Sequence, residues 1–187
     1  MPSVVLATRN KGKIKELSAL LGNFGITVQG LDAFPEIGEI PETGNTFEEN
    51  ARIKAEAVSR ATGLTALADD SGLAVEALGG APGVYSARYS GPEATDETNN
   101  AKLLAALDGV ADANRTARFV CVVVAMTPDG QSIQARGEWE GVIARERSGS
   151  EDDGVCPGAL HACRLVFSAL QKPVHSDQSR KAEGVGK

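Results

Sequence analysis

The N-terminal segment constrains the fold most, because a short buried strand is followed directly by a polar turn and a helix. Residues 3–8 form a mostly aliphatic run that is too short for a helix and ends in polar residues. From Lys11 to Leu21 apolar residues recur at three- and four-residue steps, and Gly22 supplies a stop signal. A strand, a turn and a helix in this order open an α/β unit.

The rest of the chain predicts more elements of the same mixed α/β domain, built around one sheet. Turn signals rich in Gly, Pro and Asp separate the runs of apolar residues. The expected elements are a loop over 29–45, a helix over 46–62 capped by Thr46, strands over 64–68 and 73–78 separated by a turn at 69–72, a tight loop over 79–83, a helix over 96–107, a strand over 119–126, and a pair of strands over 131–145 around Trp139, which we expect in the core.

Length, charge and apolar runs exclude several classes of protein. A length of 187 residues favours one domain. With 19 basic and 25 acidic residues the formal charge is −6, so we expect no nucleic-acid partner, because such surfaces neutralise phosphates with Lys and Arg. No apolar run predicts a membrane span or a secretory signal, and the odd number of cysteines is typical of a reducing compartment, so we expect a cytoplasmic protein.

The first candidate site is the turn between the first strand and the first helix. Unpaired backbone N–H groups at a helix N-terminus favour anions, and polar side chains here can donate hydrogen bonds to a phosphate. The alternative is a capped helix start with a solvated basic turn, which is about as common. The candidate residues are Thr8, Arg9, Asn10, Lys11, Gly12 and Lys13.

The second candidate lies on the helix expected over 46–62. Phe47, Ala51 and Val58 define its inward stripe, and Asn50 and Lys54 fall on the same stripe. A buried ammonium without a partner is too costly. Lys54 therefore either reaches past the edge of the core into solvent or faces an anion.

The third candidate is a group of carboxylates, Asp69 and Asp70 with Glu42 from the preceding loop. Mg²⁺ is usually held by one or two protein carboxylates together with substrate phosphates, and a carboxylate can also act as a general base on water. Because successive strand residues point to opposite faces, one aspartate would face the cleft and the other would brace the turn. The alternative is an Asx turn that has only a structural role.

Four segments, in this order, match a known pattern: Thr8-x-Asn10-x-x-Lys13-x-x-Glu16; Glu42-Thr43-Gly44-x-Thr46-Phe47-x-Glu49-Asn50-Ala51-x-x-Lys54-Ala55; Ala68-Asp69-Asp70-Ser71-Gly72-Leu73; and Gly79-Gly80-Ala81-Pro82-Gly83-Val84-Tyr85-Ser86-Ala87-Arg88-Tyr89. Together with Gly137-x-Trp139-x-Gly141-x-Ile143, they closely resemble the Ham1/inosine triphosphate pyrophosphatase family over residues 4 to about 147. Maf-type pyrophosphatases are a weaker match, because residues 8–13 fit the Ham1 proteins better.

The resemblance implies a hydrolase of nucleotide metabolism that converts the purine nucleoside triphosphates ITP, dITP and XTP to monophosphate and pyrophosphate. It implies an elongated mixed sheet flanked by helices, with two lobes around a nucleotide cleft, and a homodimer. The resemblance further implies that residues 8–13 bind the substrate together with Asn50, Lys54 and Ser71. Glu42 and Asp70 hold Mg²⁺, Asp70 accepts the proton of the attacking water, and Asp69 is a second acidic group.

The end of the chain departs from this pattern. We therefore divide the chain into a pyrophosphatase domain, residues 1–147, and a C-terminal segment, residues 148–187. The segment lacks the Phe-Gly-Tyr-Asp-Pro and Ser-His-Arg motifs of the family, and neither His161 nor His175 is followed by Arg. A divergent tail, a frame change and a degenerate homologue are the three explanations, and a frame change predicts a poorly folded segment. The alternative function is thus a catalytically impaired nucleotide-binding homologue.

Overall fold

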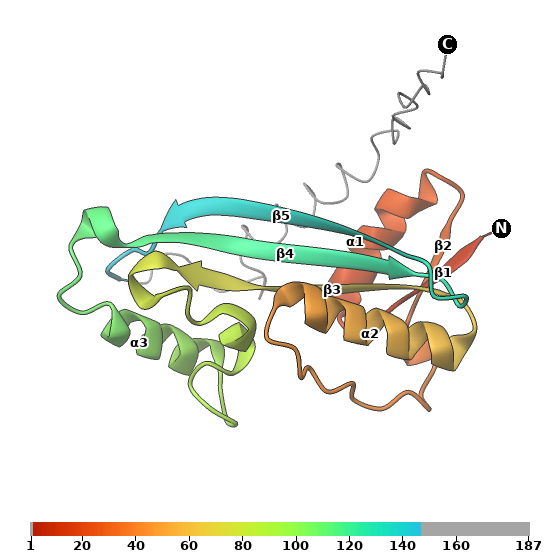
Figure 1. The fold of residues 1–187 in the computed structure, drawn as a ribbon, viewed down its shortest axis with the longest axis horizontal. Coiled ribbons are helices and arrows are strands. Elements are labelled where there is room, and N and C mark those ends of the chain that lie inside the picture. Colours follow the sequence, from red (N-terminus) through yellow and green to blue (C-terminus); the bar gives the residue numbers. More distant parts are fainter. Residues whose placement is uncertain (1, 147–187) are drawn as a thin grey trace, which may run out of the picture.

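The computed structural model describes residues 2–146 and shows one five-stranded sheet with helices on both faces (Figure 1). The strands are β1 (Ser3–Leu6), β2 (Thr27–Gly30), β3 (Thr65–Val75), β4 (Thr116–Met126) and β5 (Ser132–Val142), and the helices are α1 (Lys11–Gly22), α2 (Phe47–Thr62) and α3 (Asp96–Ala106). Four short 3-10 helices complete the elements: η1 (Leu31–Ala33), η2 (Glu76–Leu78), η3 (Gly83–Arg88) and η4 (Asp112–Asn114). The α/β class predicted from the sequence is confirmed.

The sheet is mixed and has the strand order β2-β1-β3-β4-β5. β1 pairs in parallel with β2 and β3, whereas β3, β4 and β5 pair in antiparallel fashion. The pairing of β1 with β3 covers only Val4–Leu6 against Thr65–Leu67, while β4 follows β3 from Ala66 to Val75. β3 therefore continues past the end of β1 and leaves a notch in the sheet at that point.

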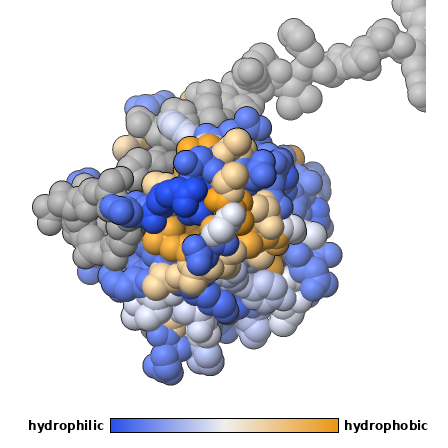
Figure 2. Space-filling view, turned by 90° about the vertical axis from the view of Figure 1, so that its left-hand side faces the viewer, coloured by the Kyte–Doolittle hydropathy of each residue, from blue (hydrophilic) through white to orange (hydrophobic). Residues whose placement is uncertain are grey.

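Alternation along the strands divides the core between the two faces. Leu67 on β3 and Val123 on β4 pack with Leu17 of α1, whereas Ala68 and Val122 pack with α2 on the other face. The two helices consequently cover opposite faces of the sheet. A further cluster of buried residues joins α3 to the ends of β3 and β4 that lie far from α1. Figure 2 looks onto that end of the molecule, where apolar residues gather within a hydrophilic rim.

Local signals explain where α1 and α2 begin and end. Asn10 caps α1, because its Oδ1 accepts hydrogen bonds from the backbone N–H groups of Gly12 and Lys13. Thr46 caps α2, as expected from the sequence, and forms a capping box with Glu49. Gly63 ends α2 in the left-handed conformation, with φ of 65°.

Four expectations from the sequence differ from the structure. Residues 69–72 are not a turn or an Asx turn but lie within β3, and residues 131–145 hold one strand rather than two. Gln29 and Gly30, expected in a loop, belong to β2. Trp139 is 41% exposed on the edge strand β5 instead of lying in the core.

Two further observations concern the extent of the chain. Among residues 2–146 no helix is both long and apolar enough to cross a membrane. The expectation that residues 148–187 form a separate and poorly folded segment lies outside the described residues.

Candidate active site

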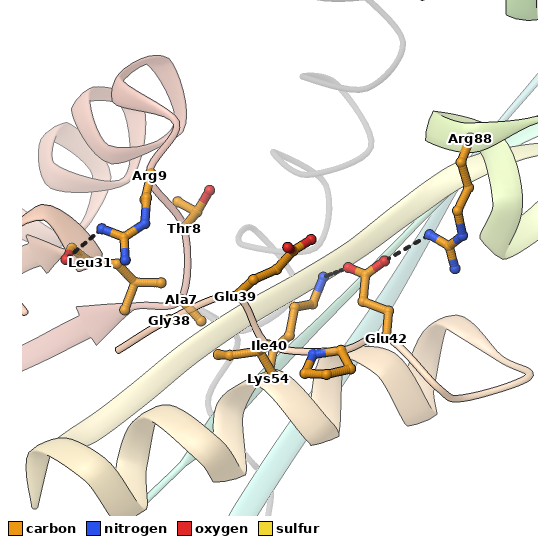
Figure 3. Close-up of a pocket in the computed structure, with 11 residues that line it drawn as sticks. Ala7, Thr8, Arg9, Leu31, Gly38, Glu39, Ile40, Glu42, Lys54 and Arg88 are labelled. Atoms are coloured by element: carbon orange, nitrogen blue, oxygen red, sulfur yellow. Dashed lines mark hydrogen bonds and ion pairs between the residues drawn. The ribbon is translucent and has the colours of Figure 1, made fainter. Parts of the chain in front are cut away.

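The candidate site lies in a cleft of about 580 Å³ at the notch beyond the end of β1 (Figure 3). Its lining includes the polar residues Thr8, Arg9, Glu42, Lys54 and Arg88. Thr8 and Arg9 follow β1 directly, while Glu42 comes from the loop before α2. Ligands of α/β proteins commonly bind outside the carboxyl ends of parallel strands, and this cleft has that position.

Lys54 lies at the centre of the polar network and faces anions instead of solvent. Its Nζ donates hydrogen bonds to Glu42 Oε1 at 2.7 Å and to Asp70 Oδ1 at 3.3 Å, and the side chain is only 14% exposed. The choice left open by the sequence is thereby resolved, because the ammonium is paired with two carboxylates.

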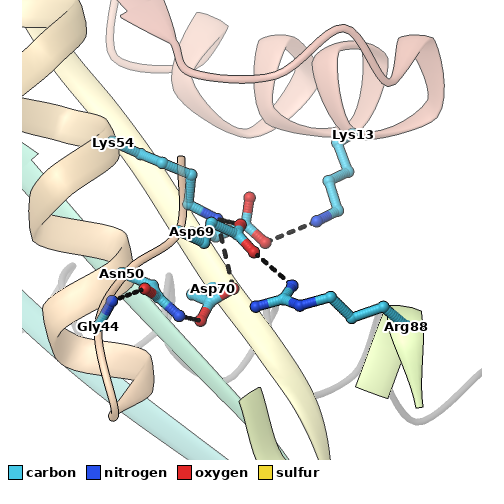
Figure 4. A network of polar contacts seen from close by, with 8 residues as sticks. Lys13, Gly44, Asn50, Lys54, Asp69, Asp70 and Arg88 are labelled. Carbon is cyan, nitrogen blue, oxygen red and sulfur yellow. Dashed lines mark hydrogen bonds and ion pairs between the residues drawn. The ribbon is translucent and has the colours of Figure 1, made fainter. Parts of the chain in front are cut away.

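Asn50 fixes the second oxygen of Asp70. The amide is fully buried; its Nδ2 donates to Asp70 Oδ2 at 3.1 Å, and its Oδ1 accepts from the backbone N–H of Gly44 at 2.8 Å (Figure 4). A Cβ at Gly44 would lie 2.8 Å from Asn50 Oδ1, so this close approach requires glycine. The amide therefore connects the loop before α2 to the central strand.

The pKa values of the two carboxylates of the site shift in opposite directions. Burial raises the pKa of Asp70; the charge of Lys54 opposes this rise, and the nearby Glu42 carboxylate adds to it. Burial also acts to raise the pKa of Glu42, but hydrogen bonds and charge interactions with Lys54 and Arg88 outweigh it and leave that pKa below its ordinary value. Asp70 is thus more basic than an ordinary aspartate, and Glu42 is less basic than an ordinary glutamate.

Asp69 and Asp70 have separate partners, as their adjacent positions in a strand require. Asp69 points to the face covered by α1, where its Oδ2 accepts a hydrogen bond from Lys13 Nζ at 2.6 Å. It does not brace a turn, because no turn exists at this point of β3. Ser71, two residues along the strand, shares the face of Asp69 rather than that of Asp70.

The turn over residues 8–13 is held together by its own polar groups. Arg9 donates hydrogen bonds to the carbonyl oxygens of Leu31 and Ile37, so its guanidinium ties the turn to the next loop. Asn10 takes up two of the backbone N–H groups at the start of α1. Of the six residues predicted to bind phosphate, Thr8 and Arg9 line the cleft, while Asn10, Lys11, Gly12 and Lys13 are not among its lining residues.

Glu39 and Arg88 line the cleft although the sequence reasoning assigned neither of them a role, and Arg88 joins the polar network. Its Nη1 donates a hydrogen bond to Glu42 Oε2 at 3.2 Å, although the two residues are 46 positions apart. The residue stands in one of the four family segments, but no periodicity relates it to Glu42. The glycine-rich loop over residues 79–83 gave a hint of this contact, since a tight turn after a strand reverses the direction of the chain and can return the next segment to the sheet.

The donor set suits a hard divalent cation. Glu42 and Asp70 both bring carboxylate oxygens to Lys54 Nζ, and two carboxylates are what a Mg²⁺ site shared with substrate phosphates commonly uses. Within residues 2–146 no group of three or more His, Cys, Asp or Glu side chains forms a site made of protein ligands alone. Glu42 and Asp70 are the residues of the cleft region that could hold such a metal ion.

Comparisons with known proteins identify the family of the chain. The sequence model of the Ham1 family matches residues 4–157. The dITP/XTP pyrophosphatase of Nitratidesulfovibrio vulgaris is 51% identical, over 97% of this chain and 86% of its own length. That of Streptococcus pyogenes serotype M1 is also 51% identical, over 94% of this chain, which spans 56% of the streptococcal protein.

Solved structures give the same result for the fold. A HAM1 protein from Coxiella burnetii superposes with a TM-score of 0.81 at 36% identity, covering 91% of this chain and 98% of that protein. The Ham1 protein of Staphylococcus aureus gives a TM-score of 0.78 at 34% identity, covering 90% and 97%. The match to the family model, the identity to the curated relatives and the similarity to these structures show that the chain, with its paired carboxylates at the notch of the sheet, belongs to the Ham1 family.

Proposed function

We propose that this chain hydrolyses non-canonical purine nucleoside triphosphates, namely ITP, dITP and XTP, to the monophosphate and pyrophosphate. The observation that carries the proposal is the grouping of Glu42, Asp70 and Lys54 beside the turn after β1. Relatives that are 51% identical to this chain over the aligned residues are dITP/XTP pyrophosphatases, which supports this choice of substrates.

We further propose that Mg²⁺ is the cofactor and that Glu42 and Asp70 hold it. When bound, the ion would offset the negative charge of the phosphates and polarise the bond to be broken. Lys54, held between both carboxylates, would add a positive charge next to the same phosphates. We also propose that Thr8, which lines the cleft, and Lys13, whose ammonium pairs with Asp69, contact the outer phosphates.

Asp70 is the residue that we assign to proton transfer. It would accept a proton from water, whose oxygen bonds to phosphorus as the bond between the α- and β-phosphates breaks and pyrophosphate leaves with the electron pair. Asn50 holds one oxygen of the carboxylate, so the other keeps a defined direction. The burial that raises the pKa of Asp70 also makes it a better proton acceptor.

The decisive experiment is pyrophosphate release from dITP, XTP and dGTP with and without Mg²⁺, using the full chain and the variant Asp70→Asn. We expect magnesium-dependent turnover of dITP and XTP, and a loss of roughly 100-fold or more in kcat for Asp70→Asn, the usual contribution of a general base. The unfolding midpoint of the variant is measured alongside to show that it folds. Binding of dITP without turnover by the wild-type chain would instead favour an impaired nucleotide-binding homologue.

Two broader properties belong to the same proposal. We propose that the protein acts as a homodimer in the cytoplasm, with nucleotides as its partners and no role for nucleic acid or membrane. The composition supports the location, because the chain is acidic and has an odd number of cysteines. The mass of the full chain in solution, by light scattering, tests the dimer.

A further inference from the structure

Arg88 approaches the cleft from the side opposite to the turn after β1 (Figure 3). Its side chain is 40% exposed, and its Nη1 lies 3.2 Å from Glu42 Oε2. It lines the main cleft and also a second, largely apolar hollow of about 550 Å³ bounded by Pro82, Tyr85 and Tyr89. The guanidinium thus stands where the two hollows meet.

The backbone that carries Arg88 is fixed to the central strand close to Asp70. Ser86 Oγ accepts a hydrogen bond from the backbone N–H of Leu73 at 2.9 Å and donates one to the carbonyl oxygen of Gly83 at 2.6 Å. The guanidinium itself lies over the ring of Tyr85, 5.2 Å from its centroid. Arg88 is therefore held in place by η3 and an aromatic ring as well as by its ion pair.

The charges of the cluster explain why Glu42 has two cationic partners. Lys54 is shared between Glu42 and Asp70, so a single ammonium faces two carboxylates. Arg88 supplies the second positive charge. The cluster of paired side chains therefore carries no net charge; its four members are Glu42, Lys54, Asp70 and Arg88 (Figure 4). If a divalent cation takes the two carboxylates, Lys54 and Arg88 lose their partners and the cluster carries an excess positive charge that matches a polyanion.

We propose that Arg88 binds a phosphate group of the substrate and of the pyrophosphate product, and that Glu42 holds its guanidinium ready at the edge of the cleft. The inference rests on the proposed function in taking the cleft as a site for a polyphosphate and a divalent cation. A planar guanidinium can donate two parallel hydrogen bonds to one phosphate, which an ammonium cannot do in the same way. The ring of Tyr85 keeps that plane oriented while its partner changes from carboxylate to phosphate.

A purely structural role makes a different prediction. If Arg88 only positioned Glu42 as a metal ligand, its removal would weaken Mg²⁺ binding, and pyrophosphate binding would fall as a consequence. If it binds phosphate, its removal takes away a competitor for Glu42, so Mg²⁺ binding stays equal or strengthens while pyrophosphate binding weakens. The two affinities therefore separate the two roles.

The experiment is calorimetric titration of the full chain with Mg²⁺ alone, and with inorganic pyrophosphate in saturating Mg²⁺. The variants are Arg88→Gln, which removes the charge, and Arg88→Lys, which keeps the charge but loses the planar fork. Arg118→Gln is the matched control, because Arg118 has a similar exposure of 44% and also pairs with a glutamate, Glu138, but does not line the cleft. Unfolding midpoints are recorded for all variants.

We expect the Kd for pyrophosphate to rise about 10- to 100-fold in Arg88→Gln, as for the loss of hydrogen bonds to a charged group. Arg88→Lys should fall between Arg88→Gln and the wild type, and Arg118→Gln should match the wild type. An unchanged pyrophosphate Kd, a parallel loss of Mg²⁺ affinity, or a wild-type chain that does not bind pyrophosphate would each overturn the inference. A wild-type chain that binds pyrophosphate through Arg88 but releases none from dITP would refute the proposed function alone.

Discussion

Asp69 and Asp70 are chemically identical neighbours with different tasks because a strand turns successive side chains to opposite faces. Asp70 meets Asn50 and Lys54 on the face of α2, whereas Asp69 meets Lys13 on the face of α1. Burial and the nearby Glu42 raise the pKa of Asp70 despite the opposing charge of Lys54. One step along the chain is thus enough to separate the carboxylate that pairs with Asn50 and Lys54 from the one that pairs with Lys13.

Asn50→Ala tests the polar connection beneath Asp70. The change leaves the Gly44 N–H and one oxygen of Asp70 without their present partner in a buried place. We expect the free energy of unfolding to fall by about 1–3 kcal/mol, measured by urea denaturation. Arg60→Ala, at an exposed position of the same helix, should stay within about 0.5 kcal/mol of the wild type, and an equal loss in both variants would contradict this account.

For single residues, the sequence predicted those whose burial follows from helical periodicity. Asn50 and Lys54 stand on the inward stripe of their helix, so their polar groups had either to find partners or to reach solvent, and the structure shows them paired. The contact of Arg88 with Glu42 was not predictable in this way, because it depends on how a 3-10 helix docks on a distant strand. The roles of Thr8 to Lys13 in binding a phosphate stay predictions.

Among the elements, β3 differs most from the expectation. Asp, Ser and Gly in succession are typical of a turn, and the sequence alone gave no reason to extend a strand through residues 69–72. In the structure β4 pairs with β3 without interruption from Ala66 to Val75, and this ladder satisfies the backbone. Long-range pairing therefore overrides the local preference, a result that no window of sequence contains.

Gly72→Ala tests the docking of η3 against β3. A Cβ at this position would lie 2.5 Å from both the carbonyl oxygen of Gly83 and Ser86 Oγ, so the segment that carries Arg88 must move. We expect a loss of about 1–3 kcal/mol in the free energy of unfolding together with weaker pyrophosphate binding. Gly22→Ala, where no atom lies within 4 Å of the new Cβ, should be neutral or slightly stabilising. A Gly72→Ala variant with wild-type stability would show that the close approach does not matter.

In the molecule as a whole, segments far apart in the chain are joined across the sheet. Arg136 on β5 donates to Glu48 on α2 at 2.6 Å, across 88 positions, and the same guanidinium pairs with Glu138. Burial acts to raise the pKa of Glu48, but the hydrogen bond and charge of Arg136 prevail and lower it. The pair therefore links the stability of the fold to pH.

The lowered pKa of Glu48 decides how the stability of the fold changes with pH. The unfolded chain binds a proton at Glu48 more readily than the folded chain does, so the pair stabilises the fold above the ordinary pKa of 4.5, and the gain is lost as the pH falls through the folded-state pKa. We expect Glu48→Gln to cost at most about 1 kcal/mol at pH 7, because the pair is partly exposed, and less at pH 3. Urea denaturation at both pH values measures this cost, with Glu140→Gln, an exposed residue of β5, as the control. A cost that does not fall between pH 7 and pH 3 would contradict the assignment.

The continuous β3 also bears on how such a chain can change in length during evolution. Because the side-chain period of a strand is two residues, inserting or deleting a single residue within β3, between Ala66 and Asp69, would exchange the faces of Asp69 and Asp70 and place the wrong carboxylate beside Lys54. The loop before α2 has no such constraint ahead of Glu42. Descendants of this sequence should therefore vary in length there, while the distance between Ala66 and Val75 stays fixed.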